Sequence, residues 1–311
     1  MSWSEANLLD QTGRTVVVTG ANGGLGLENA RALSNRGARV VMAARNQKRA
    51  AAAEARIREG QPDAQIEVRA LDLASLASVE SFARSVLRDH QRLDILINNA
   101  GVMAIPERRT EDGFEMQLGT NHLGHYVLTA RLLPLLVGTP GSRVIGVTST
   151  ARHFGRPLDP DNPHLEGNYD RWRAYGQSKL ANLHFALGLD ERFRQTSATT
   201  RSLVAHPGLT KTDLQANTAR EGGGDFWHRM ASRYGMTPAD GALPQLRAAT
   251  DPNAAGGRLY APRWVNWGPP VRRPLVGRSR NRHSIATLFA VSARETGVTL
   301  DVAAALEQTR S

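Results

Sequence analysis

The sequence predicts an α/β fold in which one doubly wound parallel sheet carries helices on both faces. Short apolar and β-branched runs alternate with stretches that favour helix, and the connections between them are short. A glycine-rich loop follows the first apolar run directly. The chain has 311 residues, 41% of them hydrophobic, and can bury a full core. We therefore expect a single domain over residues 1–311. It would comprise a core at 12–208, a lid and last strand at 209–262, and a C-terminal extension at 263–311.

The first strand is expected at 15–19, and the glycine loop after it leads into a helix at about 27–35. Glycines let the backbone approach a pyrophosphate closely, and the free amides at a helix N-terminus favour an anion. A strand, a glycine loop and a helix in this order predict a phosphate cradle of the Rossmann type, although a plain glycine turn would have a similar composition. The residues of this predicted cradle are Gly20, Asn22, Gly23, Gly24, Leu25 and Gly26.

The second strand, expected at 38–44, ends where a dinucleotide-binding sheet selects its cofactor. A sheet that binds NAD usually places Asp or Glu there to hold the ribose 2′-hydroxyl. This chain has Arg45 and Asn46 instead. A guanidinium can hold a 2′-phosphate through a planar, charge-assisted pair of hydrogen bonds. We therefore expect NADP(H) in preference to NAD(H); the alternative is that Arg45 only begins an exposed helix.

The same alternation continues through the rest of the predicted core. Helices are expected at 47–59, 76–90 and 114–137, and strands at 65–70, 93–97 and 144–148. Asp72 and Leu73 follow the strand at 65–70, and the turn at 98–101 follows the next strand. Both lie at carboxyl ends of strands, where open α/β sheets bind ligands. Ser149 ends the strand at 144–148, and a hydroxyl there can donate to a substrate oxygen as charge develops on it. A turn or capping serine would fit the same position.

Tyr175 and Lys179 are four residues apart, so their side chains would share one face of a helix. A cation beside a phenol favours the phenolate and lowers the phenol pKa from about 10 toward the working pH. The other lysines are only Lys48 and Lys211, which makes a chance pairing uncommon. The pair therefore predicts the acid/base element of a nicotinamide-dependent enzyme acting on alcohols or carbonyls. An ordinary helix that carries both residues by accident is the alternative.

Together these motifs resemble those of the classical short-chain dehydrogenase/reductase family, most closely its retinol-dehydrogenase-like branch. The matching segments run in family order across about 12–262. They are residues 19–26, 72–73, 98–101, 120–125, 149, 175–179 and 206–208.

The resemblance implies a role for each matched residue. Tyr175 would be the general acid/base, Lys179 its activator and ribose ligand, and Ser149 the group that orients the substrate oxygen. Asn121 would hold a helix irregularity and a water that relays protons. The cofactor would lie along three further groups of residues, from the adenine through the inner ribose to the nicotinamide carboxamide. These are Asp72 and Leu73; Asn99, Ala100 and Gly101; and Pro207, Gly208, Thr210 and Thr212.

Two segments interrupt the regular pattern. The loop at 152–173 is longer than in many short-chain dehydrogenases, and a similar insertion in the retinol-dehydrogenase-like branch implies that it walls one side of the substrate cleft. Residues 213–236 combine Gly222–Gly224 with large apolar side chains, which favours a mobile lid over an apolar substrate. A core-packing helix hairpin would fit this second segment equally. Helices at 237–250 and 285–294 and a last strand near 257–260 are also expected.

The net charge of +10 raises the question of an anionic partner. Because the arginines are spread along the chain and no nucleic-acid motif is present, we expect no nucleic-acid partner. The densest basic run reads as a solvated segment and is the place to examine if a polyanion is bound. It comprises Arg272, Arg273, Arg278, Arg280 and Arg282.

Composition also limits the chemistry and the compartment. The chain has no cysteine, which excludes a disulfide scaffold, a zinc–thiolate site and a cysteine nucleophile, and no metal site is predicted. The first residues lack the cationic and apolar regions of a signal peptide or of the membrane anchor common in the resembled branch. No run approaches eighteen apolar residues. We therefore expect a cytoplasmic protein without a transmembrane segment.

The leading functional hypothesis is an NADP(H)-dependent oxidoreductase that interconverts a hydrophobic alcohol and its aldehyde or ketone. The resemblance also allows a homo-oligomer that pairs through the helices at 114–137 and 174–194. One alternative is a dinucleotide-binding sensor or interaction protein without catalysis, which the joint presence of Ser149, Tyr175 and Lys179 disfavours. Another is reduction of a carbon–carbon double bond, which the same tyrosine could serve and which only product analysis would separate.

Overall fold

The computed structural model describes residues 2–212, 214, 218 and 225–309. It contains one eight-stranded sheet of order β3-β2-β1-β4-β5-β6-β7-β8, in which β1 to β7 are parallel and β8 is antiparallel to β7. The strands are β1 Thr15–Thr19, β2 Arg39–Ala44, β3 Ile66–Ala70, β4 Ile95–Asn98, β5 Arg143–Val147, β6 Arg201–Ala205, β7 Leu259–Pro262 and β8 Pro270–Arg273. The predicted α/β class and the doubly wound sheet are confirmed, whereas β6 and β8 are absent from the predicted strands.

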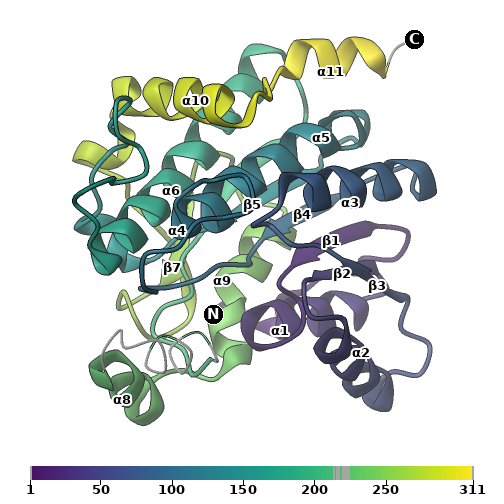
Figure 1. The fold of residues 1–311 in the computed structure, drawn as a ribbon. Helices are drawn as coiled ribbons and strands as arrows, with labels where there is room; N and C mark the ends of the chain where they lie inside the picture. The colour runs from purple at the N-terminus through teal and green to yellow at the C-terminus, as the bar shows by residue number, and fades with distance from the viewer. Residues whose placement is uncertain (1, 213, 215–217, 219–224, 310–311) are drawn as a thin grey trace.

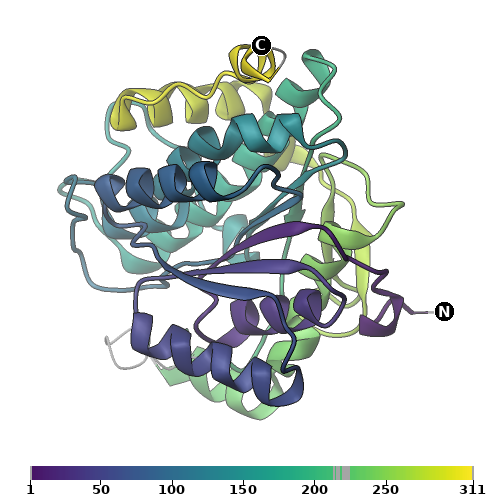
Figure 2. The same ribbon diagram turned by 90° about the vertical axis from the view of Figure 1, so that its right-hand side faces the viewer.

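Helices cover both faces of this sheet (Figures 1 and 2). They are α1 Gly24–Ser34, α2 Gln47–Gly60, α3 Leu76–Asp89, α4 Met116–Leu118, α5 Gly124–Gly138, α6 Arg171–Gln195, α8 Asp225–Tyr234, α9 Pro238–Thr250, α10 Arg282–Thr296 and α11 Val302–Gln308. Helices α1, α2 and α9 lie on one face, and α3, α5 and α6 lie on the other, with α10 and α11 outside them (Figure 1).

The central strands are apolar on both sides because both of their faces are covered. On β1, Val17 faces the cluster that contains α3, α5 and α6, whereas Val16 and Val18 face the cluster that contains α1 and α9. All three side chains are fully buried. Unbroken β-branched runs of this kind are typical of parallel strands. The alternation sets the register, in which Val16 pairs with Val40 of β2 and with Ile95 of β4.

The helix predicted at 114–137 is interrupted, so the expectation of one continuous helix is wrong. A π-helical turn, η2 (Gly119–Leu123), separates α4 from α5. Its amide–carbonyl spacing is five residues, as shown by the hydrogen bond from Gly124 N to Gly119 O. The Asn121 carbonyl accepts instead from the ring Nδ1 of His125, at 3.0 Å. A buried side chain thus takes the place of a backbone donor, which is a common cause of such turns.

The C-terminal region is part of the folded core. The helix expected at 285–294 is confirmed within α10, which packs against α6. Phe289 of α10 lies 5.6 Å from Phe185, centroid to centroid, and the Arg192 guanidinium lies 3.5 Å above the Phe289 ring. The unexpected edge strand β8 begins with Pro270, a residue that edge strands tolerate at their first position.

The predicted lid falls mostly outside the described residues. Its glycine segment, Gly222–Gly224, and the side chains of Phe226 and Trp227 lie outside them. Helix α8 follows this segment, and α9 begins after Thr237, whose hydroxyl accepts from Asp240 N at 3.1 Å. Within the described part of the chain, no helix has the length and apolar character needed to cross a bilayer.

Candidate active site

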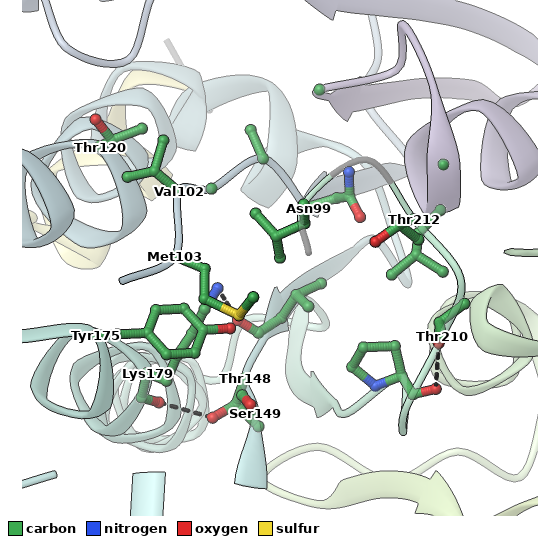
Figure 3. A pocket seen from close by; sticks show the side chains of 18 of the residues that line it. Asn99, Val102, Met103, Thr120, Thr148, Ser149, Tyr175, Lys179, Thr210 and Thr212 are labelled. Carbon is green, nitrogen blue, oxygen red and sulfur yellow. Dashed lines mark hydrogen bonds between the residues drawn. The ribbon is translucent and has the colours of Figure 1, made fainter. Parts of the chain in front are cut away.

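A cavity of about 710 Å³ opens at the carboxyl ends of the central strands. It lies where the strand order reverses, between β1 and β4, the position at which doubly wound sheets bind ligands. Of the residues predicted for the site, all line this cavity except Gly26 and Asn121. Figure 3 shows Tyr175 and Lys179 on one helix facing Ser149, with Asn99 and Thr212 toward the opposite end.

The predicted acid/base pair is buried on one face of α6. Tyr175 and Lys179 are each 4% exposed. The Lys179 Nζ lies 5.6 Å from the Tyr175 ring centroid and donates to the Val147 carbonyl at 3.4 Å. The N-cap of α6 is Asp170, whose carboxylate accepts from Arg173 N at 2.7 Å. This cap supports the first turn of the helix that presents the pair.

The electrostatics of the pair differ from the sequence-based expectation. Burial raises the pKa of Tyr175 to about 12, and a hydrogen bond with the Ser149 side chain acts in the opposite direction. Burial also lowers the pKa of Lys179 to about 8. In this structure burial thus acts on the phenol in the direction opposite to that expected of a neighbouring cation. Both groups are enclosed, and desolvation disfavours the charged form of each.

Asn121 supports the site from behind the cavity wall. It is fully buried; its Oδ1 accepts from Val102 N at 2.8 Å, and its Nδ2 donates to the Val102 carbonyl at 2.9 Å. The same Nδ2 donates to the Ser178 hydroxyl at 2.9 Å, which in turn donates to the Tyr175 carbonyl at 2.8 Å. A Cβ atom at Gly101 would lie 2.9 Å from Asn121 Oδ1. Asn121 is thus placed to hold the segment at Val102 and helix α6 in position. The helix irregularity that the resemblance implied at Asn121 is present as the π-helical turn η2.

A second buried network joins the glycine loop to the π-helical turn. The Thr19 hydroxyl accepts from Asn99 N and Ala100 N, at 2.9 and 3.0 Å, and lies 2.9 Å from His125 Nε2. Because the Asn121 carbonyl can only accept, His125 Nδ1 must carry a proton. Burial lowers the pKa of His125 to about 4, so Nε2 is an acceptor, and the Thr19 hydroxyl shares its proton between Nε2 and the Ile97 carbonyl, which lies at 3.3 Å. Neither Thr19 nor His125 is a predicted site residue. The sequence indicates them only in that both lie within segments that match the family motifs.

The glycine loop fits a dinucleotide phosphate. Gly23 precedes the first turn of α1, and no described side chain caps that helix end. The amides of this first turn are thus left without a side-chain cap, and Gly23, Gly24 and Leu25 line the cavity. Gly26 lies outside the lining because it packs against the loop: a Cβ there would come within 2.3 Å of the Gly20 carbonyl oxygen.

Arg45 and Asn46 occupy the far end of the cavity. The Arg45 side chain is 73% exposed, and its Nη1 lies 3.8 Å from the Asp72 carboxylate. At that exposure the pair is weak, and the guanidinium can reorient. Asn46 caps α2, because its side chain accepts from Arg49 N at 3.0 Å. Of the two residues, Arg45 has the side chain that is suited to hold an anion.

Apolar side chains line the end of the cavity near Tyr175. They are Met103, Phe154, Trp172 and Leu214. The loop at 152–173 contributes Phe154 and Trp172 to this wall, whereas its middle packs on α10. There His164 Nε2 lies 2.9 Å from the Glu295 carboxylate, and Arg294 donates to the Pro160 carbonyl at 2.7 Å. The expectation that this loop walls the cleft therefore holds for its two ends. Met103 and Phe154 are not among the predicted site residues.

Several known proteins are similar to this chain in sequence, and a solved structure is similar to it in fold. Residues 14–222 match the family model described as short chain dehydrogenase. Retinol dehydrogenase 14 of Mus musculus is 38% identical over 265 residues, covering 80% of this chain and 77% of its own length. Retinol dehydrogenase 12 of Homo sapiens is 37% identical over 288 residues, covering 92% and 87%. A crystal structure of an uncharacterized protein from Mycobacterium paratuberculosis has a TM-score of 0.80 at 37% identity, covering 96% of this chain and 99% of that one.

Proposed function

This chain belongs to the short-chain dehydrogenase family, in its retinol-dehydrogenase-like branch, and on that premise we propose that it is an NADP(H)-dependent reductase of hydrophobic aldehydes or ketones. Membership makes it an oxidoreductase that acts on CH–OH or C=O groups with a nicotinamide dinucleotide. The proposed cofactor and substrate class rest on how the residues are arranged around one cavity. Tyr175, Lys179 and Ser149 meet at its apolar end, and the glycine loop and Arg45 line its other end.

Each part of the cavity would serve one part of the dinucleotide. The first amides of α1 would bind the pyrophosphate, and Arg45 would hold the 2′-phosphate. Lys179 would bind the ribose, and the segment from Pro207 to Thr212 would hold the carboxamide end. When bound, the cofactor supplies the hydride chemistry, while the protein supplies alignment and proton transfer.

The site would supply a proton to a carbonyl oxygen at neutral pH. Because burial holds the pKa of Tyr175 near 12, the phenol is protonated at neutral pH and can donate to a carbonyl oxygen. Ser149 would hold the same oxygen. The Lys179 ammonium would stabilise the phenolate that remains, and with a pKa of about 8 it is charged at neutral pH. The apolar wall, with Met103 and Trp172, would exclude water from the reacting carbonyl.

The cofactor preference is tested by fluorescence titration with NADPH and NADH. We expect the wild type to bind NADPH more tightly, and Arg45→Ala to weaken NADPH binding by roughly tenfold to a hundredfold while NADH binding stays constant. Lys48→Ala is the matched control, because Lys48 is an exposed cation nearby that does not line the cavity. Equal losses for both nucleotides would contradict the assignment of Arg45 to the 2′-phosphate.

The acid/base role is tested with Tyr175→Phe. We expect NADPH affinity to be kept and turnover of apolar aldehydes and ketones to fall at least about a hundredfold, because the proton donor is lost. Tyr234→Phe is the control, since Tyr234 is 53% exposed. Unchanged turnover in Tyr175→Phe would refute the role. Nucleotide binding without turnover of any carbonyl by the wild type would favour the sensor hypothesis, and a saturated product with its carbonyl intact would favour double-bond reduction.

A further inference from the structure

The C-terminal basic run does not lie wholly in solvent. Arg272, Arg278, Arg280 and Arg282 are exposed and Arg273 is half-buried, but Arg273 and Arg278 both interact with the loop that follows Ser149. Arg278 donates to the His153 carbonyl, and Arg273 of β8 acts electrostatically on Arg152. Cations that are more than a hundred residues apart in the chain thus lie close to the loop that follows Ser149.

Arg152 is the buried member of this group. It lies in η3 (Thr150–His153) and is 9% exposed. Its Nη1 donates to the Ser149 carbonyl at 3.0 Å, whereas its Nε is buried and has no hydrogen-bond acceptor. Burial, and then Arg273, lower its pKa to about 10. No carboxylate of the described residues forms an ion pair with it. A buried guanidinium with a free donor and no counter-charge is unusual in a stable fold.

His206 links this charge to the cavity. It follows β6, lines the cavity and is 3% exposed. Neither of its ring nitrogens completes a hydrogen bond, although the Thr148 backbone and the Asn266 side chain lie close enough to act on its pKa. Burial, and then Arg152, lower that pKa to about 3, so the ring is neutral at working pH and keeps one N–H donor. We refer to Arg152, His206 and Arg273 as the Arg152 cluster.

We propose that the Arg152 cluster binds an anionic group of the substrate, a carboxylate or a phosphate carried on the same molecule as the reacting carbonyl. This inference rests on the proposed function and narrows its substrate class. An oxyanion would supply both the missing counter-charge and the missing acceptor of Arg152 Nε. Arg152 and Arg273 do not themselves line the cavity, but Arg152 donates to the carbonyl of Ser149, and Ser149, His206 and Asn266 all line it. The substrate would then be amphipathic, with its apolar part against Met103 and Trp172.

Anion binding is tested first by thermal unfolding, which does not depend on turnover. Melting temperatures are measured in phosphate and in chloride at equal ionic strength, with saturating NADP⁺ so that the glycine loop and Arg45 are occupied. We expect phosphate to raise the melting temperature of the wild type by a few degrees. Arg152→Met and Arg273→Met should lose this effect. Arg272→Met, an exposed neighbour on β8, is the matched control and should retain it.

The substrate assignment is tested with two ketones that differ only in a terminal carboxylate. We expect the ratio of kcat/KM for the carboxylated ketone to that for the neutral ketone to fall about tenfold or more in Arg152→Met and in Arg273→Met. The ratio should stay constant in Arg272→Met. Arg273→Met keeps the test informative if Arg152→Met fails to fold, because Arg273 does not contact Ser149.

The outcomes separate the two proposals. No phosphate effect in the wild type, or an effect that survives in both variants, would overturn the Arg152 cluster as an anion site. A phosphate effect that both variants lose, with an unchanged substrate ratio, would mean that the cluster binds a free anion only. Absence of wild-type turnover on both ketones would overturn the proposed function and the substrate assignment with it, while the melting data would still decide whether the anion site exists.

Discussion

At the scale of single residues, the candidate site depends on polar groups that are held out of water. Tyr175 and Lys179 lie four residues apart on α6, and each is almost fully buried. Burial moves both pKa values toward the neutral forms, to about 12 for the phenol and to about 8 for the ammonium. A charged lysine in this position costs folding free energy, which natural proteins commonly accept at functional sites.

Lys179→Met is expected to stabilise the fold and abolish turnover. Below pH 8 the wild type must bury an ammonium, so the variant should gain on the order of 2 kcal/mol in the free energy of unfolding at pH 7. Wild-type stability should rise between pH 8 and pH 10.5, where the unfolded state binds the extra proton, and the gain of the variant should shrink over the same range. Urea denaturation at pH 7 and pH 10 measures both.

Lys211→Met provides the control for this prediction, because Lys211 is exposed and does not line the cavity. Its free energy of unfolding should stay constant at both pH values. A Lys179→Met variant that is less stable than the wild type at pH 7 would show that the burial of this lysine is not costly. Wild-type turnover should also fall above pH 8, as the ammonium is lost.

At the scale of elements, the site depends on close backbone approaches at two turns. The glycine loop closes onto α1 so tightly that a side chain at Gly26 would collide with the backbone of Gly20. The π-helical turn η2 (Gly119–Leu123) is held by the His125 ring and by the Asn121 clamp on Val102. Backbone atoms cannot move away as a flexible side chain can, so these contacts constrain the residue types.

Gly26→Ala is expected to damage both stability and nucleotide binding. The added Cβ would lie 2.3 Å from the Gly20 carbonyl oxygen and 2.8 Å from Asn99 Nδ2. We expect a loss of about 1–3 kcal/mol in the free energy of unfolding and at least about a tenfold loss in NADPH affinity. Gly60→Ala is the control, because nothing lies within 4 Å of a Cβ there and Gly60 ends α2. It should change stability by less than about 1 kcal/mol.

At the scale of the whole molecule, the fold has an additional helical layer on one side. Helices α10 and α11 lie over α5 and α6, on the side away from α1, α2 and α9 (Figure 1). Phe289 packs against Phe185 and Tyr126, at centroid distances of 5.6 and 6.2 Å. The C-terminal segment therefore shares the core on which α6 and its acid/base pair rest.

Phe289→Ala is expected to destabilise the whole molecule by about 3–5 kcal/mol, because it removes a buried aromatic ring from the core that α10 and α6 share. A single cooperative unfolding transition with an unchanged denaturant slope would show that α10 unfolds with the rest of the chain. His283→Ala, an exposed substitution at the start of the same helix, should change stability by less than about 0.5 kcal/mol. A separate early transition in the wild type would contradict the shared core.

By itself, the sequence determined the elements and motifs whose signals are local. The strand at 15–19, the glycine loop after it and the spacing of Tyr175 and Lys179 can each be identified within a window of about ten residues, because backbone periodicity and glycine geometry act over that range. The doubly wound order follows from the alternation of such windows. Nearly all of the cofactor-binding residues predicted from these motifs line one cavity.

Tertiary structure alone decided the features that depend on partners distant in the chain. The raised pKa of Tyr175 follows from enclosure by several elements, and the Asn121 clamp needs Val102 and Ser178 in place. The Arg152 cluster joins η3, the residue after β6, and β8, which no local pattern connects. Burial and electrostatic contact are properties of the packed molecule, and they are absent until distant segments meet.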